Sequence, residues 1–507
     1  MLHSPLKLCC CIFLFFLPLA LLDHANFPFS DGAEHGAAIR TLAQNFITPA
    51  DPMLAGDHTG SPRYVPSIWL MAAVTRLLHL DILLTLKLSG IVGFLLFVWA
   101  LFLFAREYFG DKVRGSCTLV AMLFLWGIGW QGANAYMFSA IVHTAYYPSV
   151  VAFSLSFLAF FFELRFLNHR SKKALSAALI LGGLAFVNHP LTGSFYLVCF
   201  ILLLIERNGW NKKTIGLTFL AAAVVLALSV VWPYYSFFAS LFEIFSGRMS
   251  AAGDYQLTWQ YLHSKPVLRM GFALTALPLI GILACRRQHL LLTGGFAFFS
   301  AIYIFGTVTR ISLSERFVFF ILVMLQMTFA CFWGSWAIPG RKYWKKGARV
   351  MTLLILGGIL LQTGLAWQTS VWQAFRQVPG KVLPRYENPN RMQLELRQYL
   401  SEKSIVMADI YSGWALPVYT GARIIALYHT PPHIADNLQR YRDTERFYAL
   451  NTPRAKRREL LERYKVTHVF FNYVLNAATR AIAKQMPQLG YKKMVGNKRY
   501  AVYRIDR

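Results

Sequence analysis

The stretch IFLFFLPLALLDHANFPFSDGAEH, residues 12–35, passes from an apolar run directly into a polar segment. We interpret residues 7–23 as an uncleaved signal anchor, because the apolar run continues beyond the cysteines that a lipoprotein signal would place at its end. Asp31, Glu34 and His35 follow just past the predicted exit from the membrane. Ionisable groups there indicate a polar site at the membrane surface, whereas a transporter more often buries such groups within its spans.

The composition is that of a membrane protein. Hydrophobic residues make up 56% of the 507 residues, and apolar runs long enough to cross a bilayer recur along the chain. Much of the formal net charge of +28 lies in short loops between these runs, as the positive-inside rule expects. No nucleic-acid-binding signature accompanies the charge, so we predict no nucleic-acid partner. All seven cysteines lie in or beside apolar runs, which argues against a disulfide framework or a thiolate metal site.

Five short basic loops set the predicted topology, because cytoplasmic loops are enriched in lysine and arginine. They are AREYFGDKVR (105–114), RFLNHRSKK (165–173), ERNGWNKK (206–213), CRRQ (285–288) and GRKYWKKGAR (340–349). The eleven predicted spans fall near 7–23, 84–104, 117–133, 149–164, 174–188, 192–205, 214–232, 268–284, 289–307, 317–337 and 350–368. Residues 64–80 are apolar but short. If they crossed the membrane, the loop at 105–114 would fall outside, so we predict a helix that lies in the outer interface.

The chain therefore divides into two predicted parts. Residues 1–372 form a polytopic α-helical membrane domain with a long first outer loop over 24–83, and residues 373–507 form a small soluble α/β domain on the outer side. In the second part, strand-like apolar runs alternate with helix-like stretches, which predicts a largely parallel sheet. The strand-like runs are 404–410, 423–428, 467–472 and 499–505, and the helix-like stretches are 434–449, 453–465 and 475–487.

Asp31 in the first outer loop has two interpretations. Ser30 or Asp31 could cap a helix over 33–45, with Glu34 in its first turn. Alternatively, a carboxylate at a helix start beside lipid headgroups could act as a general base on a hydroxyl group. We take Asp31, and after it Glu34, as the candidate catalytic residues.

Three arginines are candidates for holding a phosphate, which arginine binds through paired, charge-assisted hydrogen bonds. Arg316 is the first choice, because it enters a span from the outer side beside Glu315, and a guanidinium at that depth needs an anionic partner. Arg310 and Arg63 are the alternatives, although snorkelling at the interface explains Arg310 equally well.

Three further candidates lie in the outer connections. His189 interrupts an apolar stretch within NHPLTG (188–193), which also forms a hairpin turn between two spans. His58 lies in a turn-rich loop where a solvated role is the simpler explanation. Tyr146 could form a platform for a sugar ring, although tyrosines at span ends more often belong to the aromatic belt of the interface.

Three segments carry a resemblance to a known family: GDHTGSPRYVPSIWL (56–70) after an acidic first outer loop, NHPLTG, and ADIYSGWALPVYTGARIIALYHTPP (408–432) in the tail. Together with the layout of most of the chain, they resemble the GT-C membrane glycosyltransferases. That superfamily includes the protein O-mannosyltransferases and the aminoarabinose transferase of lipid A. The resemblance implies a catalytic carboxylate at Asp31, an inverting single displacement, and a sugar donor carried on a polyprenyl phosphate.

The resulting expectation is a glycosyltransferase of the bacterial inner membrane that faces the periplasm and transfers a sugar to a hydroxyl on a lipid or glycan acceptor. No cofactor is expected. A divalent metal is the alternative, but the chain lacks the paired DxD motif of the metal-dependent members of the family. Two alternatives remain. A polysaccharide polymerase or ligase of related architecture would depend less on the first-loop carboxylate. A lipid-linked sugar transporter or flippase would need an ionisable pathway through the membrane, and the predicted spans hold few charges at mid-depth.

Overall fold

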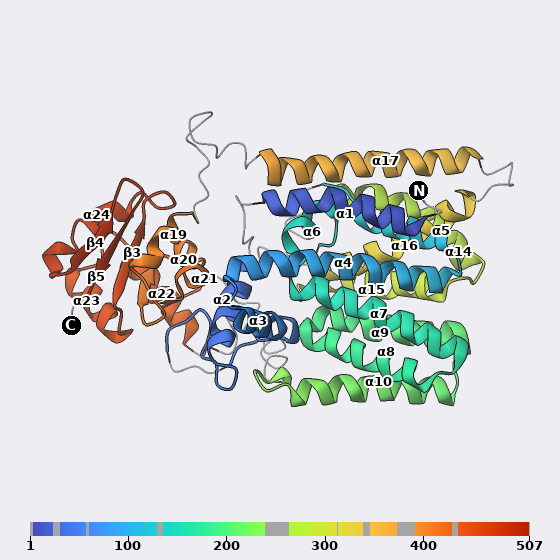
Figure 1. Ribbon diagram of the computed structural model, residues 1–507, viewed down its shortest axis with the longest axis horizontal. Coiled ribbons are helices and arrows are strands. Elements are labelled where there is room, and N and C mark those ends of the chain that lie inside the picture. The colour runs from blue at the N-terminus through green and yellow to red at the C-terminus, as the bar shows by residue number, and fades with distance from the viewer. Residues whose placement is uncertain are drawn as a thin grey trace.

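The computed structural model consists of a bundle of long helices with a small α/β unit at one end (Figure 1). It describes residues 4–23, 31–56, 60–128, 135–238, 263–311, 313–337, 345–372, 391–427, 434 and 436–505. Nine helical stretches in these ranges are long and apolar enough to cross a membrane. A polytopic helical membrane protein with a C-terminal α/β unit was predicted from the sequence, and this fold class is confirmed.

Within the described ranges, the bundle contains eleven helical passes. They are α1 (Pro5–Leu22), α4 (Ile82–Phe109), α5 (Lys112–Phe124), α7 (Pro148–His169), α8 (Lys172–Asn188), α9 (Pro190–Asn208), α10 (Lys212–Val231), α13 (Pro266–Met270) with η1 (Gly271–Ala276) and α14 (Leu277–Cys285), α15 (Leu290–Thr309), η2 (Ser314–Phe317) with α16 (Val318–Ala337), and α17 (Lys345–Trp367) with η4 (Gln368–Trp372). Only α5 and α8, with 13 and 17 residues, are shorter than an ordinary span. Each predicted span overlaps one of these passes.

Consecutive passes run in opposite directions, so the connections between them alternate between the two ends of the bundle. Four of the five basic loops, and residues 345–349 of the fifth, therefore share the end that lies away from the α/β unit (Figure 1). The opposite end carries α2 (Gly32–Gln44), α3 (Pro66–Leu78), α6 (Phe138–Thr144) and the α8–α9 hairpin. This end holds most of the polar residues that the sequence singled out.

The helices α16 and α7 form the centre of the bundle. Their apolar segments are 89% and 72% buried, compared with 22% for α10 at the periphery. Aromatic rings fill this core: Phe195 of α9 stacks on Phe320 of α16, with ring centroids 5.0 Å apart. Gly93 of α4 lets the turn between α6 and α7 approach closely, because a Cβ there would clash with the carbonyl oxygen of Ala145. That turn carries two tyrosines toward the polar end of the bundle.

The helix α3 matches the prediction for residues 64–80. Its 13 residues span about 20 Å, which is too short to cross about 30 Å of hydrocarbon. Leu70, Leu77 and Leu78 are exposed, whereas Ser67 is buried and its backbone N–H donates to the Oδ1 of Asn188 at 2.9 Å. One face of α3 is thus anchored to the bundle and the other is apolar, as expected for an interfacial helix.

The α/β unit contains a five-stranded sheet with the strand order β2-β1-β3-β5-β4. The strands are β1 (Ile405–Ala408), β2 (Arg423–Ile424), β3 (His468–Asn472), β4 (Lys492–Gly496) and β5 (Tyr500–Arg504). Strands β2, β1 and β3 are parallel, as predicted, whereas β5 and β4 join antiparallel. The sequence analysis missed β4 because it is a polar edge strand in which Lys492 and Lys493 are exposed, a pattern that protects sheet edges.

Helices cover the sheet and connect it to the bundle. They are α19 (Arg391–Glu395), η5 (Leu396–Gln398), α20 (Ile410–Gly413), α21 (Leu416–Thr420), α22 (Asn437–Tyr448), α23 (Arg454–Arg463), α24 (Thr479–Ala483) and η6 (Pro487–Leu489). Of the predicted helices, 434–449 and 453–465 correspond to α22 and α23, and 475–487 contains the shorter α24. The predicted domain boundary at 372/373 adjoins residues that lie outside the described part, so it stays a prediction.

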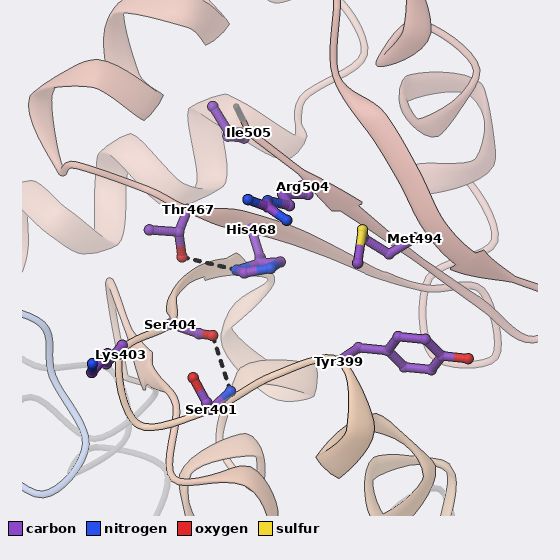
Figure 2. Close-up of a pocket in the computed structure, with 9 residues that line it drawn as sticks. All are labelled: Tyr399, Ser401, Lys403, Ser404, Thr467, His468, Met494, Arg504 and Ile505. Carbon is purple, nitrogen blue, oxygen red and sulfur yellow. Dashed lines mark hydrogen bonds between the residues drawn. The ribbon is translucent and has the colours of Figure 1, made fainter. Parts of the chain in front are cut away.

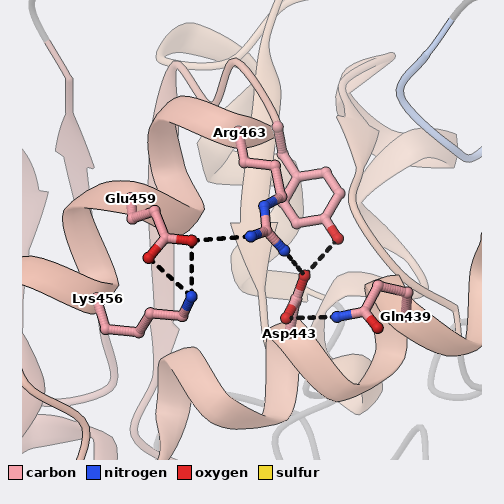
Figure 3. Close-up of polar contacts among 6 residues, drawn as sticks. Gln439, Asp443, Lys456, Glu459 and Arg463 are labelled. Carbon is pink, nitrogen blue, oxygen red and sulfur yellow. Dashed lines mark hydrogen bonds and ion pairs between the residues drawn. The ribbon is translucent and has the colours of Figure 1, made fainter.

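A network of ion pairs and hydrogen bonds joins α22 to α23 (Figure 3). Arg463 donates to Asp443 at 2.9 Å and to Glu459 at 2.8 Å, and Lys456 donates to Glu459 at 2.6 Å. Asp443 also accepts from the side-chain amide of Gln439 at 2.9 Å. Because Glu459 and Arg463 are largely exposed, these pairs orient the helices more than they stabilise them.

Candidate active site

Asp31 stands at the N-terminus of α2, where the chain turns from the first span into the first outer loop. Its carbonyl oxygen accepts hydrogen bonds from the backbone N–H groups of Glu34 and His35, both at 3.0 Å. Its side chain makes no capping hydrogen bond to the helix. The carboxylate of Asp31 is therefore not used to cap α2, which was the first of the two interpretations of this residue.

The start of α2 is capped instead by Tyr147, which follows α6 at the entrance to α7. The hydroxyl oxygen of Tyr147 accepts a hydrogen bond from the backbone N–H of Gly32 at 3.0 Å. The ring of His35 meets the ring of Tyr147 edge-on, with centroids 4.9 Å apart and planes at 78°. These two contacts fix the first turn of α2, and with it Asp31, against the bundle.

His189 and Arg316 approach the same place from two other elements, the α8–α9 hairpin and η2. The charges of Arg316 and Asp31 both act on the imidazole of His189. The structure thus brings together three residues that the sequence had singled out separately, Asp31, His189 and Arg316. Arg316 is a quarter exposed, and its Nε lies 3.8 Å from Glu315 Oε1, a long contact for an ion pair.

Both histidines of this cluster are neutral at physiological pH. Burial, followed by the positive charge of Arg316, lowers the pKa of His189 to about 3, although Asp31 opposes the shift. Burial also lowers the pKa of His35 to about 4, again against the effect of Asp31. The Nδ1 of His189 accepts from the backbone N–H of Thr192 at 3.3 Å and lies 2.9 Å from the Thr192 hydroxyl, so in the tautomer that keeps the backbone bond the proton resides on Nε2. His189 can therefore act as a neutral hydrogen-bond donor.

Glu34 occupies a different environment from Asp31. Its side chain is buried and forms an ion pair with Arg63. Its Oε1 also accepts a hydrogen bond at 2.7 Å from the indole N–H of Trp414, which lies 380 residues away in the α/β unit. Because both carboxylate oxygens are engaged, this geometry suits a residue that holds α2 against the α/β unit rather than one that transfers a proton. The same pair engages Arg63, which was a candidate for phosphate binding.

The contact between α2 and the α/β unit extends beyond Glu34. Arg40 donates to the carbonyl oxygen of Val418 in α21 at 2.9 Å. Gly36 lets α21 approach, because a Cβ at this position would clash with the side chain of Val418. The α/β unit therefore packs on the helix that begins at Asp31, and Trp414 belongs to the surroundings of the candidate site.

The remaining predicted residues are placed as follows. Arg310 is exposed at the end of α15 in a left-handed conformation, with φ of 57°. Tyr146 is buried, with its ring edge-on to Tyr147 at 5.0 Å, so it supports the tyrosine that caps α2. His58 lies outside the described residues. Whether these residues bind a substrate stays a prediction.

The sequence analysis missed a second polar cluster at the same end of the bundle. Asp23, directly after α1, is buried and pairs with His143 Nδ1 of α6 at 2.5 Å, and His143 Nε2 lies 3.0 Å from the hydroxyl of Thr369. Lys87 of α4 interacts electrostatically with Asp23. The position of Asp23 at the exit of the first span was a usable signal, but its partner in the loop at 134–148 could not be identified from the sequence.

Within the described ranges, no group of three or more histidine, cysteine, aspartate or glutamate side chains is arranged to hold a metal ion. The expectation that the protein needs no cofactor stays a prediction.

Comparison with known proteins was informative only at the level of structure. No protein-family model matches the chain, and no curated protein sequence matches it. The structure is similar to that of ArnT from Cupriavidus metallidurans in the apo state, with a TM-score of 0.55 and 14% identity over 97% of each chain.

Two further structures are similar over almost all of this chain. The archaeal oligosaccharyltransferase AglB from Archaeoglobus fulgidus, solved with an inhibitory peptide and a dolichol-phosphate, gives a TM-score of 0.55 at 12% identity, covering 99% of this chain and 74% of AglB. The arabinofuranosyltransferase AftD from Mycobacteria gives 0.59 at 12% identity, covering 99% of this chain and 42% of AftD. These neighbours are GT-C glycosyltransferases, so the chain has the GT-C fold.

Proposed function

We propose that this chain, which has the GT-C fold, is a membrane glycosyltransferase that moves a sugar from a polyprenyl-phosphate donor to an acceptor hydroxyl. The observation that carries the proposal is that Asp31, His189 and Arg316 share the end of the bundle on which the α/β unit packs, close enough for the charges of Asp31 and Arg316 to act on His189. A carboxylate, a neutral imidazole donor and a guanidinium are the groups that such a transfer needs. The dolichol-phosphate in the AglB structure supports a lipid phosphate as the donor's leaving group.

In the proposed reaction Asp31 accepts the proton of the acceptor hydroxyl. At the same time, the oxygen of that hydroxyl forms a bond to the anomeric carbon of the donor sugar. The bond from that carbon to the phosphate oxygen breaks at the same time, and its electron pair leaves with the lipid phosphate. One displacement on the face opposite the leaving group inverts the anomeric configuration. Because the phosphate leaves readily, the protein contributes mainly positioning and charge stabilisation.

Arg316 and His189 would act on the leaving group. Arg316 stays cationic and can donate two parallel hydrogen bonds to a phosphate. His189 can donate from Nε2 without adding a positive charge, since the pKa of His189 lies at about 3. Arg316 would then supply the charge, while His189 fixes the orientation of the phosphate.

We further propose that the end of the bundle bearing the site faces the periplasm of a bacterial inner membrane. The basic loops at the opposite end, four of which lie wholly within the described residues, support this orientation through the positive-inside rule. The donor would enter from the outer leaflet, and the α/β unit would project into the periplasm above the site.

The test is sugar transfer by the Asp31→Asn variant in proteoliposomes, supplied with a panel of sugars carried on undecaprenyl phosphate. Asp31→Asn should lower turnover by roughly 10²- to 10⁴-fold, the usual contribution of a general base, and should leave binding of undecaprenyl phosphate unchanged. The matched control is Asp81→Asn at the same end of the bundle. Asp81 caps α4 through Leu83 N at 2.8 Å, a bond that an asparagine oxygen can keep.

The same samples separate transfer from transport. A flippase would move the labelled lipid between leaflets with no change in its sugar, and Asp31→Asn would leave that movement intact. Turnover that survives in Asp31→Asn, or lipid movement without transfer in the wild type, would contradict the proposed function.

A further inference from the structure

Among the described residues of the α/β unit, two hollows lie at opposite ends of the parallel strands. The one at the amino ends of β1 and β3 is lined by Lys403, His468 and Arg504 and has a volume of about 460 Å³ (Figure 2). Two of its hydroxyls are already engaged: Thr467 Oγ1 lies 2.9 Å from His468 Nδ1, and Ser404 Oγ accepts from Ser401 N at 3.0 Å. Figure 2 shows the Lys403 amine directed away from the Arg504 guanidinium. This hollow offers no converging set of groups.

The second hollow lies where the connections of the sheet diverge. After β1 the chain passes to β2 on one side, and it returns to the other side of β1 as β3. The carboxyl ends of two such strands leave a crevice between them, which is where open α/β sheets bind their ligands. A pocket of about 480 Å³ occupies this position, with Asp409 following β1 and Asn476 following β3. Tyr411, Thr444, Glu445 and Leu475 also line it.

Two buried polar groups in this pocket lack part of their hydrogen bonding. Asp409 caps α20 through Oδ1, which accepts from Ser412 N at 3.1 Å. Its Oδ2 is buried and has no hydrogen-bond partner among the described residues, and the same holds for Thr444 Oγ1. Asp409 is 8% exposed and Thr444 is fully buried. Leaving such groups unpaired is costly, so a bound ligand or water that supplies donors would be stabilised here.

The chemistry of the lining selects the class of ligand. The carboxylates of Asp409 and Glu445 would repel a phosphate, and the turn after β1, DIYSG, lacks the glycine pattern that cradles a nucleotide. Carboxylate, amide and hydroxyl groups instead accept from and donate to several neutral hydroxyls at once. The exposed Tyr411 and Leu475 side chains offer apolar surface for the C–H face of a ring.

We propose that this pocket, formed by Asp409, Tyr411, Thr444, Glu445, Leu475 and Asn476, is a binding site for a neutral carbohydrate. A short segment of chain connects the pocket to the candidate active site. From Asp409 the helix α20 leads to Trp414, whose indole bonds to Glu34 in the first turn of α2. A glycan held in the pocket is therefore placed beside the helix that presents Asp31. That it is the acceptor glycan rests on the proposed function, whereas sugar binding itself does not.

The experiment measures the binding of neutral trisaccharides to the full-length protein by saturation-transfer NMR. The panel contains trisaccharides of glucose, mannose and N-acetylglucosamine. The protein is held in nanodiscs or an amine-oxide detergent, since detergents with sugar headgroups would compete for the site. Wild-type protein should bind at least one of the three.

Two variants test the pocket. Glu445→Gln should weaken binding by about tenfold, because a hydrogen bond to a charged group is lost. Asp409→Asn should have a similar effect while its remaining oxygen still caps α20. The matched control is Glu462→Gln, an exposed carboxylate of α23 outside the pocket and outside the α22–α23 network, which should bind as the wild type does.

Asp31→Asn separates this proposal from the proposed function. It should bind the trisaccharide with unchanged affinity, whether or not the protein transfers sugar. Absence of binding to any trisaccharide by folded wild-type protein would overturn the proposal, as would normal binding by both pocket variants. Inorganic phosphate or Mg²⁺ that binds in this pocket in place of sugar, with loss in the same variants, would also overturn it.

Discussion

The hydrogen bond between Trp414 and Glu34 should help to hold the α/β unit against the helix α2 of the bundle. Trp414→Phe keeps an aromatic ring and removes only the indole N–H that donates to Glu34 Oε1 at 2.7 Å. Glu34 is 3% exposed, so little water can replace the lost donor. A hydrogen bond to a buried charged group contributes about 1.5–3 kcal/mol, although the ion pair with Arg63 remains.

This loss should appear as easier local opening of α2. A difference of about 1.5–3 kcal/mol corresponds to roughly 10- to 100-fold faster amide exchange in the first turns of α2 and in α21. Hydrogen exchange followed by mass spectrometry measures both segments in one experiment. The control is Trp367→Phe, at an exposed tryptophan at the end of α17, which should leave the exchange of α2 unchanged. Equal protection in Trp414→Phe and wild type would refute a stabilising role for this bond.

Three further predictions concern the donor site, the topology and pH. Arg316→Lys keeps the charge but loses the paired hydrogen bonds, so it should weaken binding of undecaprenyl phosphate by about tenfold; unchanged affinity would return Arg316 to a structural pair with Glu315. A single cysteine at Ser171 should be shielded from an impermeant thiol reagent in intact cells, whereas a single cysteine at Asn451 should be labelled. The reverse pattern would invert the topology. The pKa of His35, about 4 in the fold against about 6.5 unfolded, means that the unfolded state binds more protons between these values. The free energy of unfolding should therefore fall as pH drops from 6.5 to 4, by up to roughly 3 kcal/mol more in wild type than in His35→Gln. Melting temperatures that depend on pH in the same way in wild type and in His35→Gln would contradict this.

Much of the bundle could be predicted because a span is a local property of the sequence. Each pass needs a run of apolar residues, and the basic loops between runs fix which ends lie together. Counting passes was enough to place residues 64–80 outside the set of spans, and α3 is too short to cross. The parallel strands were also predictable, since buried strands are apolar runs, whereas β4 was hidden by its exposed lysines.

The candidate site could be predicted only in part, because its contacts join distant segments. The position of Asp31 after the first span was visible in the sequence. Its proximity to His189 and Arg316 depends on how the start of α2, the α8–α9 hairpin and η2 pack together. The role of Glu34 depends on Trp414, 380 residues away, and no local pattern marks such a pair. The pairing of Asp23 with His143 was missed for the same reason.

The central claim is that the carboxylate of Asp31 takes the proton from the acceptor hydroxyl during sugar transfer. The most direct measurement is the single-turnover rate of transfer from an undecaprenyl-phosphate-linked sugar by Asp31→Asn and by Glu34→Gln, compared with wild type in the same proteoliposomes. We predict that Asp31→Asn loses roughly 10²- to 10⁴-fold in this rate with donor binding intact, and that Glu34→Gln loses less. A rate for Asp31→Asn close to that of wild type, or a larger loss in Glu34→Gln, would contradict the claim.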